Sequence, residues 1–248
     1  MPWNEVAPDI SIVIPVYRAV DRLDASLALL TKFVRTATVG VQIIFVDDAS
    51  DDGTGEQLFL FAAEHDAVML ITHEKNLGKG RSVADGVAAA CGKIVVFTDI
   101  DMPYDLSAII FMYEKFLADK RVHMLVGSRH HDDSVLEKPY TFVRRFSSWT
   151  FKNVARILVG TKFSDAQCGI KGFRLDAARL LFSDLIVSRF AFDVELFLRA
   201  KKFNLLYEEI PVIFRHEPHS TVKLVPASIQ MFRDLVRLHR VYGNKNST

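Results

Sequence analysis

The sequence predicts an α/β protein with a mostly parallel, Rossmann-like sheet that is covered by helices on both faces. Short runs rich in β-branched residues alternate with segments of helical periodicity through the first half of the 248-residue chain. This alternation is typical of βαβ units. The expected strands are apolar along their whole length, as in sheets that helices cover on both sides. Half of the residues are hydrophobic and a quarter are charged, which suits one large buried core.

Five strands and four helices follow one another in this half of the chain. The expected strands are Ile10–Val16, Val41–Val46, Val68–Thr72, Ile94–Thr98 and Val122–Gly127. The helices expected between them are Asp21–Val34, Gly55–His65, Gly80–Ala90 and Leu106–Asp119. Sheets of this kind place their chemistry at the carboxyl ends of the strands, so the polar residues that follow each strand are the candidates for a site.

The pattern changes after residue 130. Segment 130–139 is polar, contains a proline and is expected to be a loop. An amphipathic helix is expected at Tyr140–Val159. Its apolar side carries Phe142, Phe146, Trp149, Val154 and Ile157. Its other side carries Arg145, Lys152 and Arg156.

A second amphipathic helix is expected at Pro226–Tyr242. A stripe of Arg233, Arg237 and Arg240 is predicted to lie opposite Phe232, Leu235 and Val236. Two interpretations remain open for both helices. Either each packs on the core with its charged side in water, or both lie in a membrane interface.

The net charge of +1 conceals an asymmetry along the chain. Residues 1–119 hold 9 Lys and Arg against 18 Asp and Glu, whereas residues 120–248 hold 22 against 12. An acidic half suits a cation, and a basic half suits anions or a membrane surface. We expect no nucleic-acid partner.

We expect neither a signal peptide nor a membrane-spanning segment. The N-terminus lacks the basic start and apolar core of a signal peptide. The apolar runs, such as Ile12–Val16, are far shorter than the ~20 residues that cross a bilayer. Cys91 and Cys168 have neither metal-ligand spacing nor a disulfide framework, which favours a reducing compartment.

Two strand ends carry groups suited to a nucleoside. The first strand ends in Ile14-Pro15-Val16-Tyr17, where the proline interrupts the hydrogen-bond ladder and the tyrosine can stack on a flat base. The second continues into Val46-Asp47-Asp48-Ala49-Ser50-Asp51-Asp52-Gly53-Thr54. Asp47 and Asp48 can accept hydrogen bonds from a base N–H and from ribose hydroxyls. Asp51, Asp52 and Gly53 are expected to form a turn, and Thr54 is expected to cap the following helix.

The fourth strand ends in Phe97-Thr98-Asp99-Ile100-Asp101. Residues two apart in extended backbone point to the same side, so both carboxylates can approach one cation. Hard divalent ions such as Mg²⁺ or Mn²⁺ prefer oxygen ligands and can bridge a diphosphate. We therefore predict a metal site at Asp99 and Asp101.

A glycine-containing turn, His73-Glu74-Lys75-Asn76-Leu77-Gly78-Lys79-Gly80, precedes the third helix. A helix N-terminus with Lys79 or Arg81 favours an anion. The spacing of a Walker loop is missing. An ordinary strand-to-helix turn explains the segment almost as well.

In this order, IPVY, VDDASDDGT, NLGKG, TDID and the Gly127-Ser128-Arg129 segment resemble the family 2 glycosyltransferases of GT-A fold. Two later segments, DAQCGIKGFR at 165–174 and FAFDVEL at 190–196, are similar to the dolichyl- and polyprenyl-phosphate sugar transferases, especially the dolichyl-phosphate glucosyltransferase branch. The resemblance runs from about Ile10 to Arg240.

The resemblance implies a role for individual residues. The nucleoside would be held by Pro15, Tyr17, Asp47 and Asp48. The metal and donor diphosphate would lie on Asp99 and Asp101, with the Ile100 backbone beside them. Arg129 would lie near the transferred sugar and the acceptor phosphate, and Arg144 or Arg145 would meet the lipid phosphate. Arg215 and Lys223 would close over the diphosphate. Some mannosyl relatives place a further ligand two residues after the second metal aspartate, where this chain has Pro103.

The expected reaction is metal-dependent, inverting transfer of a hexose to a polyprenyl or dolichyl phosphate, with UDP-glucose favoured as donor and GDP-mannose next. A phosphate monoester is largely dianionic at neutral pH and needs no strong base, only cationic groups such as Arg129 and Arg145. One alternative is a saccharide or protein hydroxyl acceptor, with Asp193 or Glu195 as base. Another is a non-catalytic nucleotide-sugar-binding subunit, against which the intact Asp99 and Asp101 argue.

We expect one glycosyltransferase domain over residues 1–248. Residues 10–130 would form the nucleotide-sugar and metal half, and residues 131–248 the acceptor and membrane-facing half. With no membrane span expected, the protein would be cytoplasmic and would sit peripherally on the cytoplasmic membrane face or dock onto a membrane-embedded partner.

Overall fold

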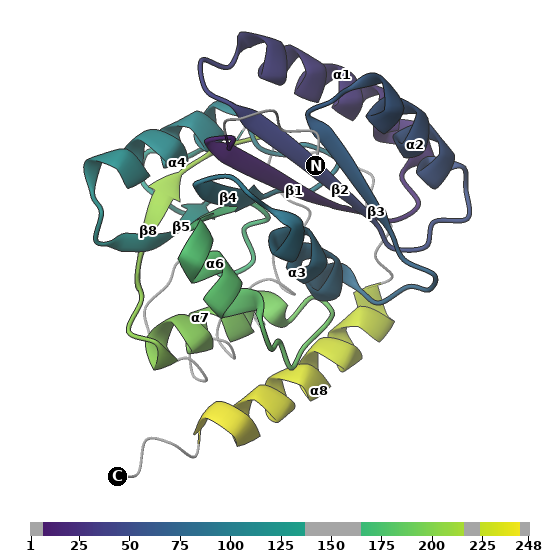
Figure 1. The fold of residues 1–248 in the computed structure, drawn as a ribbon. Coiled ribbons are helices and arrows are strands. Elements are labelled where there is room, and N and C mark those ends of the chain that lie inside the picture. Colours follow the sequence, from purple (N-terminus) through teal and green to yellow (C-terminus); the bar gives the residue numbers. More distant parts are fainter. Residues whose placement is uncertain (1–6, 137–164, 216–223, 244–248) are drawn as a thin grey trace.

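The computed structural model describes residues 7–136, 165–215 and 224–243. Its large sheet contains β1 Ile10–Val16, β2 Val41–Asp47, β3 Val68–Thr72, β4 Ile94–Phe97, β5 Val122–Ser128, β7 Lys171–Arg174 and β8 Leu206–Pro211. A small sheet pairs β6 Val135–Leu136 with β9 Ile213–Phe214. The helices are α1 Val20–Thr36, α2 Thr54–Glu64, α3 Lys79–Ala89, α4 Ser107–Ala118, α6 Leu175–Phe182, α7 Phe192–Lys202 and α8 Leu224–Tyr242 (Figure 1).

The seven-stranded sheet has the order β3-β2-β1-β4-β7-β5-β8 and is parallel except at β7. Strand β7 enters antiparallel between β4 and β5, where Gly172 lies opposite Val96 on one side and Leu125 on the other. Lys171 at the start of β7 pairs with Phe97 at the end of β4. The mostly parallel sheet is confirmed, and its one reversed strand brings the segment before β7 to the carboxyl end of β4.

Successive strand residues supply two separate cores. Val13 and Phe97 belong to the core that α3, α6 and α7 cover. Their neighbours Ile12 and Val96 belong to the core that α1 and α4 cover. Because side chains alternate across a strand, a continuously apolar strand serves both faces. The predicted covering of both faces by helices is confirmed, and Figure 1 shows α1 and α2 on the side of the molecule away from α8.

All five strands and four helices predicted in the first half are present, with ends shifted by a few residues. Segment 130–139, predicted to be a loop, contains β6 in its described part, and that prediction is wrong there. The partner of Val135–Leu136 is Ile213–Phe214, so the pairing depends on residues far away in the sequence.

The remaining elements of the second half, α6, α7, β7, β8 and β9, were not predicted. The helix predicted at Tyr140–Val159 lies outside the described residues.

Helix α8 is amphipathic, but its sides differ from the prediction. Leu235 and Leu238 are buried, whereas Phe232 is 61% and Val236 is 37% exposed. The same exposed side carries the basic stripe of Arg233, Arg237 and Arg240. The prediction that Phe232 and Val236 lie opposite the arginines is therefore wrong. Leu235 and Leu238 define the side of the helix that faces the core, and Phe232 and Val236 do not lie on that side. No helix in the described ranges is long and apolar enough to cross a bilayer.

Candidate functional site

The carboxyl ends of β1, β2 and β4 meet at one edge of the sheet. Val16 pairs with Asp47 in the register of β1 and β2. The Thr98 backbone N–H donates to Val13 O at 3.1 Å, which brings the end of β4 to the same edge. The structure thus gathers the strand ends that carry six predicted site residues: Pro15, Tyr17, Asp47, Asp48, Asp99 and Asp101.

Asp48 is buried, and its carboxylate holds the loop that leads into α3. The N–H groups of Leu77 and Gly78 donate to it at 2.7 and 2.8 Å, and His73 Nδ1 lies 2.8 Å from Oδ1. Asp47 is also buried and accepts a hydrogen bond from the Ser50 N–H at 3.1 Å. Both carboxylates shape this edge of the sheet, and their direct contact with a nucleoside stays a prediction.

The turn after β2 is tied to the turn after β1. Arg18 pairs with Asp51 at 2.6 Å, and the Thr54 hydroxyl accepts a hydrogen bond from the Ala19 N–H at 2.9 Å. The prediction that Thr54 caps α2 is wrong, because α2 has no side-chain cap and the hydroxyl binds the start of α1 instead. Tyr17 is 37% exposed beside these turns, a position open to a stacking partner.

Backbone strain concentrates at this edge. Four described residues other than glycine have positive φ, and three of them follow the strand ends: Arg18 at 47°, Ala49 at 62° and Met102 at 42°. Each such conformation costs about 1–3 kcal/mol and persists only where the surrounding structure enforces it. Strain of this kind is typical of functional sites.

Asp99 and Asp101 follow β4, with the buried Ile100 between them. Lys79 Nζ, from the start of α3, lies 2.5 Å from Asp99 Oδ1. Burial and the neighbouring Asp99 raise the pKa of Asp101. Burial alone would lower the pKa of Lys79, but the carboxylates of Asp99, Asp193 and Asp101 raise it above its ordinary value.

A second lysine lies beneath this cluster. Lys171, at the start of β7, is fully buried and donates to Asp193 Oδ1 at 2.6 Å and to Cys168 O at 2.7 Å. Its Nζ also lies 5.3 Å from the centroid of the Phe97 ring. Burial raises the pKa of Asp193, opposed by Lys171 and Lys79. The Asp193 carboxylate is therefore hydrogen-bonded to a lysine rather than standing alone as a base.

Arg129, at the end of β5, is bound by Asp165. Its Nε and Nη2 donate to the two carboxylate oxygens at 2.5 and 2.7 Å, and its guanidinium lies 5.7 Å from the Phe214 ring centroid. Burial would raise the pKa of Asp165, but the hydrogen bonds and charge of Arg129 outweigh it and hold that pKa below its usual value. Any role of Arg129 toward a phosphate must coexist with this pair.

The other predicted arginines have separate positions. The Arg215 guanidinium pairs with Asp105 at 2.8 Å, and the Arg215 backbone N–H donates to Pro103 O at 2.7 Å. Arg215 therefore lies beside the loop that follows Asp101. Arg144, Arg145 and Lys223 lie outside the described residues.

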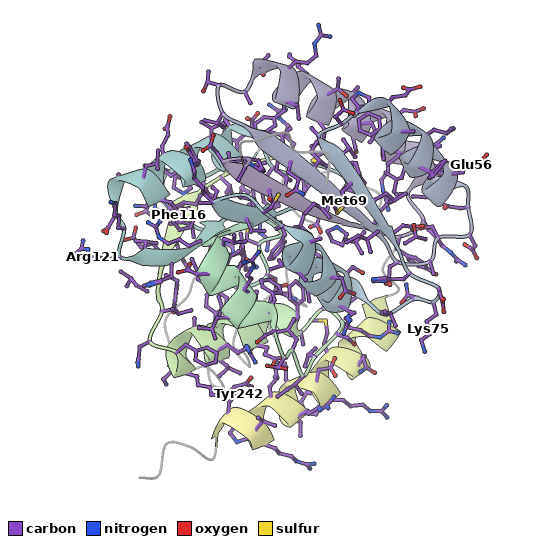
Figure 2. The ribbon with its side chains drawn as sticks, in the orientation of Figure 1. Glu56, Met69, Lys75, Phe116, Arg121 and Tyr242 are labelled. Atoms are coloured by element: carbon purple, nitrogen blue, oxygen red, sulfur yellow. The ribbon has the colours of Figure 1, made fainter. Side chains whose placement is uncertain are left out.

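Glu195 belongs to the scaffold. It is fully buried and accepts hydrogen bonds from the N–H groups of Ile186 and Val187 at 2.9 Å. The hydroxyl of Tyr242, labelled on α8 in Figure 2, donates to the same carboxylate at 3.1 Å. These bonds tie α7 and α8 together, so the geometry gives Glu195 a structural position.

The comparisons with known proteins agree with this architecture. The model of the family described as glycosyl transferase family 2 matches residues 11–182. The chain belongs to glycosyltransferase family 2. This glycosyltransferase is 32% identical to the human dolichyl-phosphate beta-glucosyltransferase, over 97% of this chain and 78% of the relative. It is 28% identical to the enzyme of that name from Dictyostelium discoideum, over 94% and 74%.

A solved structure establishes the fold independently. Glucosyl-3-phosphoglycerate synthase from Mycobacterium tuberculosis, crystallised with Mn²⁺, uridine diphosphate and glucosyl-3-phosphoglycerate, superposes with a TM-score of 0.66. The two chains are 16% identical, and the match covers 93% of this chain and 80% of that one. The predicted GT-A fold is thereby confirmed.

The acidic residues of the glycosyltransferase fit a divalent cation. Asp99 and Asp101 supply hard oxygen donors, and the raised pKa of Asp101 reflects burial and negative charge that a cation would offset. The described ranges contain no cluster of three or more His, Cys, Asp or Glu able to hold a metal. Two carboxylates completed by substrate phosphates and water are the usual arrangement for Mg²⁺.

Gly169, from the DAQCG segment, makes room for the Asp99 carboxylate. Its N–H donates to the Tyr104 hydroxyl at 2.9 Å, and a Cβ at this position would overlap Asp99 Oδ2. The antiparallel entry of β7 places this glycine beside Asp99. The segment that carried the family resemblance thus has a packing function.

Gly169→Ala is expected to lower turnover by about 100-fold, because a displacement of ~1 Å in a group that positions the substrate can cost that much. The thermal midpoint should fall only slightly. Gly40→Ala is the control. Gly40 is remote from the site, and an added Cβ there would lie 3.3 Å from the nearest atom. Steady-state kinetics and thermal melts measure both effects. Wild-type kinetics for Gly169→Ala would show that Asp99 needs no such room.

Several residues around the site were not singled out from the sequence. Asp165, Gly169 and Lys171 carried the family resemblance but received no role. The available signal was a lysine and an aspartate close to two glycines in one short segment, DAQCGIKG at 165–172. A Lys–Asp pair that joins β7 to α7 is recognisable only after these elements are placed together.

Proposed function

We propose that this glycosyltransferase transfers glucose from a nucleotide-sugar to a polyprenyl or dolichyl phosphate, with inversion at the anomeric carbon. UDP-glucose is the favoured donor and GDP-mannose the next. The observation that carries the proposal is the meeting of Asp99 and Asp101 with the two nucleoside-type strand ends at one edge of the sheet. The names of the relatives, dolichyl-phosphate beta-glucosyltransferases, support the acceptor and the sugar.

The donor would lie across this edge. Tyr17 would stack on the base, and Pro15, Asp47 and Asp48 would complete the nucleoside pocket. Asp99 and Asp101 would hold Mg²⁺ or Mn²⁺, which offsets the charge of the leaving nucleoside diphosphate when bound. Arg215 and Lys223 would cover the diphosphate, with the Ile100 backbone beneath it.

The acceptor side of the site would orient a phosphate dianion. Its second pKa near 6 leaves the phosphate ready to attack without a base. Arg129 and Arg145 would neutralise and align it, because a guanidinium offers a planar fork of donors. Support comes from the two candidate bases, since Glu195 is bound by backbone N–H groups and Asp193 by Lys171.

A double variant tests the acceptor class. Asp193→Asn alone would leave Lys171 buried and unpaired, so Asp193→Asn is combined with Lys171→Met. We expect kcat within about tenfold of wild type with polyprenyl phosphate, because no general base is removed. The assay incubates nucleotide-sugar, Mn²⁺ and either polyprenyl phosphate or a saccharide, and identifies the product by mass spectrometry. A folded double variant that loses over about a thousandfold in kcat would support a base and a hydroxyl acceptor.

We also propose that the protein works peripherally at the cytoplasmic face of a membrane, with residues 131–248 turned toward it in a single domain. The exposed side of α8 supports this, because Phe232 and Val236 lie there among arginines. Aromatic and aliphatic groups can enter the lipid interface while basic groups meet anionic headgroups.

Binding to anionic liposomes is expected to weaken steeply as salt rises, because each basic residue contributes about 1 kcal/mol that salt screens. Reversal to glutamate of Arg145, Lys152, Arg156, Arg233, Arg237 and Arg240 should abolish flotation with these vesicles. Reversal of the exposed Lys32 and Arg35 on α1 is the control and should change little. If wild type ignores anionic vesicles at low salt, docking on a membrane-embedded partner replaces this proposal.

A further inference from the structure

Lys79 lies at the point where the acidic cluster is neutralised. It is the first residue of α3, and its Nζ lies 2.5 Å from Asp99 Oδ1. The Lys79 side chain is 19% exposed and that of Asp99 is 32% exposed. The contact is therefore neither sealed in the core nor fully solvated, and a ligand can reach it.

The backbone around Lys79 is tightly fixed. Gly78 has a φ of +95°, and a Cβ there would lie 2.7 Å from Ser188 O. A Cβ at Gly80 would lie 2.8 Å from Phe192 Cβ. The Gly78 N–H also donates to Asp48 at 2.8 Å. The start of α3 is thus held against both α7 and the end of β2, and only the flexible lysine side chain is left to move.

The second lysine of the cluster cannot share this role. Lys171 is fully buried and is committed to Asp193 and Cys168 O. Lys79 is the described cation that is paired directly with Asp99, while the charge of Arg22 also acts to lower the pKa of Asp101. A divalent ion placed on these two carboxylates would repel an ammonium group held against Asp99.

We propose that Lys79 occupies the cation position beside Asp99 before the donor binds, and moves to the donor diphosphate when metal and nucleotide bind together. This inference rests on the proposed function of the site. The positive end of α3 lies at the same place and favours a phosphate there. Lys79 thereby couples metal binding to nucleotide binding, since metal alone must displace the lysine and metal with diphosphate gives it a new partner.

Lys79→Met separates the two halves of this coupling. Without nucleotide, the variant should bind Mn²⁺ about tenfold more tightly than wild type, which corresponds to ~1.4 kcal/mol. With saturating Mn²⁺, it should bind nucleoside diphosphate about tenfold more weakly. Titration calorimetry and Mn²⁺ electron paramagnetic resonance measure the first, and calorimetry with UDP and GDP the second. Neither readout depends on turnover.

The controls distinguish failure of this inference from failure of the proposed function. Lys75→Met removes an exposed lysine of the same loop, labelled in Figure 2, and should change neither affinity. Lys79→Gln is a second neutral variant, and circular dichroism checks its folding. If both Lys79 variants bind Mn²⁺ no more tightly than wild type, Lys79 does not occupy the cation position beside Asp99. If their affinity for the diphosphate is unchanged, Lys79 does not move to the diphosphate. If wild type binds Mn²⁺ no better than Asp99→Asn, the proposed metal site and this inference both fall.

Discussion

Asp99→Asn and Asp101→Asn are each expected to lower turnover by about a thousandfold while the protein stays folded. The amide is nearly isosteric but neutral, so it removes the charge that would hold a divalent cation against the donor diphosphate. Excess chelator should inactivate wild type to a similar extent. Asp119→Asn is the control, because Asp119 pairs with Arg121 on a distant surface labelled in Figure 2. Full turnover of wild type in chelator would remove the metal from the proposal.

The stability of the Asp101→Asn variant should move in the opposite direction from its turnover. Burial and Asp99 raise the pKa of Asp101 in the folded state, so ionised Asp101 destabilises the fold once the pH exceeds its unfolded value. That cost is relieved as the pH falls through the raised pKa. In metal-free buffer at neutral pH, Asp101→Asn should therefore melt at or above the wild-type temperature. A clear drop in its thermal midpoint would mean that Asp101 has a structural partner.

Arg129→Ala is expected to lower both activity and stability. The variant leaves the buried Asp165 without the guanidinium that binds both of its oxygens. Breaking a buried pair on one side costs about 3–5 kcal/mol, which lowers the thermal midpoint by roughly 6 °C or more in a chain of this size. By comparison, Arg121→Ala on the exposed Asp119 pair should barely change the thermal midpoint, because solvent screens that pair. Thermal melts and kcat/KM with a polyprenyl phosphate acceptor provide the measurements.

A second variant separates folding from catalysis at Arg129. Arg129→Met combined with Asp165→Asn removes both charges and should restore most of the lost stability, because no unpaired ion stays buried. If Arg129 aligns the acceptor phosphate, turnover should remain low in this double variant although its stability is restored. Recovery of turnover together with stability would show that Arg129 acts only through the scaffold.

The sequence by itself determined the first half of the fold and the place of the site. Strands such as Ile10–Val16 are continuously apolar and short, and the helices between them have clear periodicity, so local patterns were sufficient. The acidic groups after β2 and β4 follow strands whose parallel pairing places their ends at one edge. The motif order also indicated the family that the comparison of residues 11–182 shows.

Tertiary structure alone decided the second half and the partners within the site. Strand β7 is four residues long, contains lysine, glycine and arginine, and forms a strand because β4 and β5 offer it partners on both sides. That insertion brings Gly169 against Asp99 and Lys171 against Asp193, residues with no local pattern to reveal the contact. The Lys79–Asp99 pair and the exposure of Phe232 on α8 likewise depend on how elements that are far apart in the sequence pack together. Burial and ion pairing depend on which distant elements meet, and neither periodicity nor spacing along the chain encodes that.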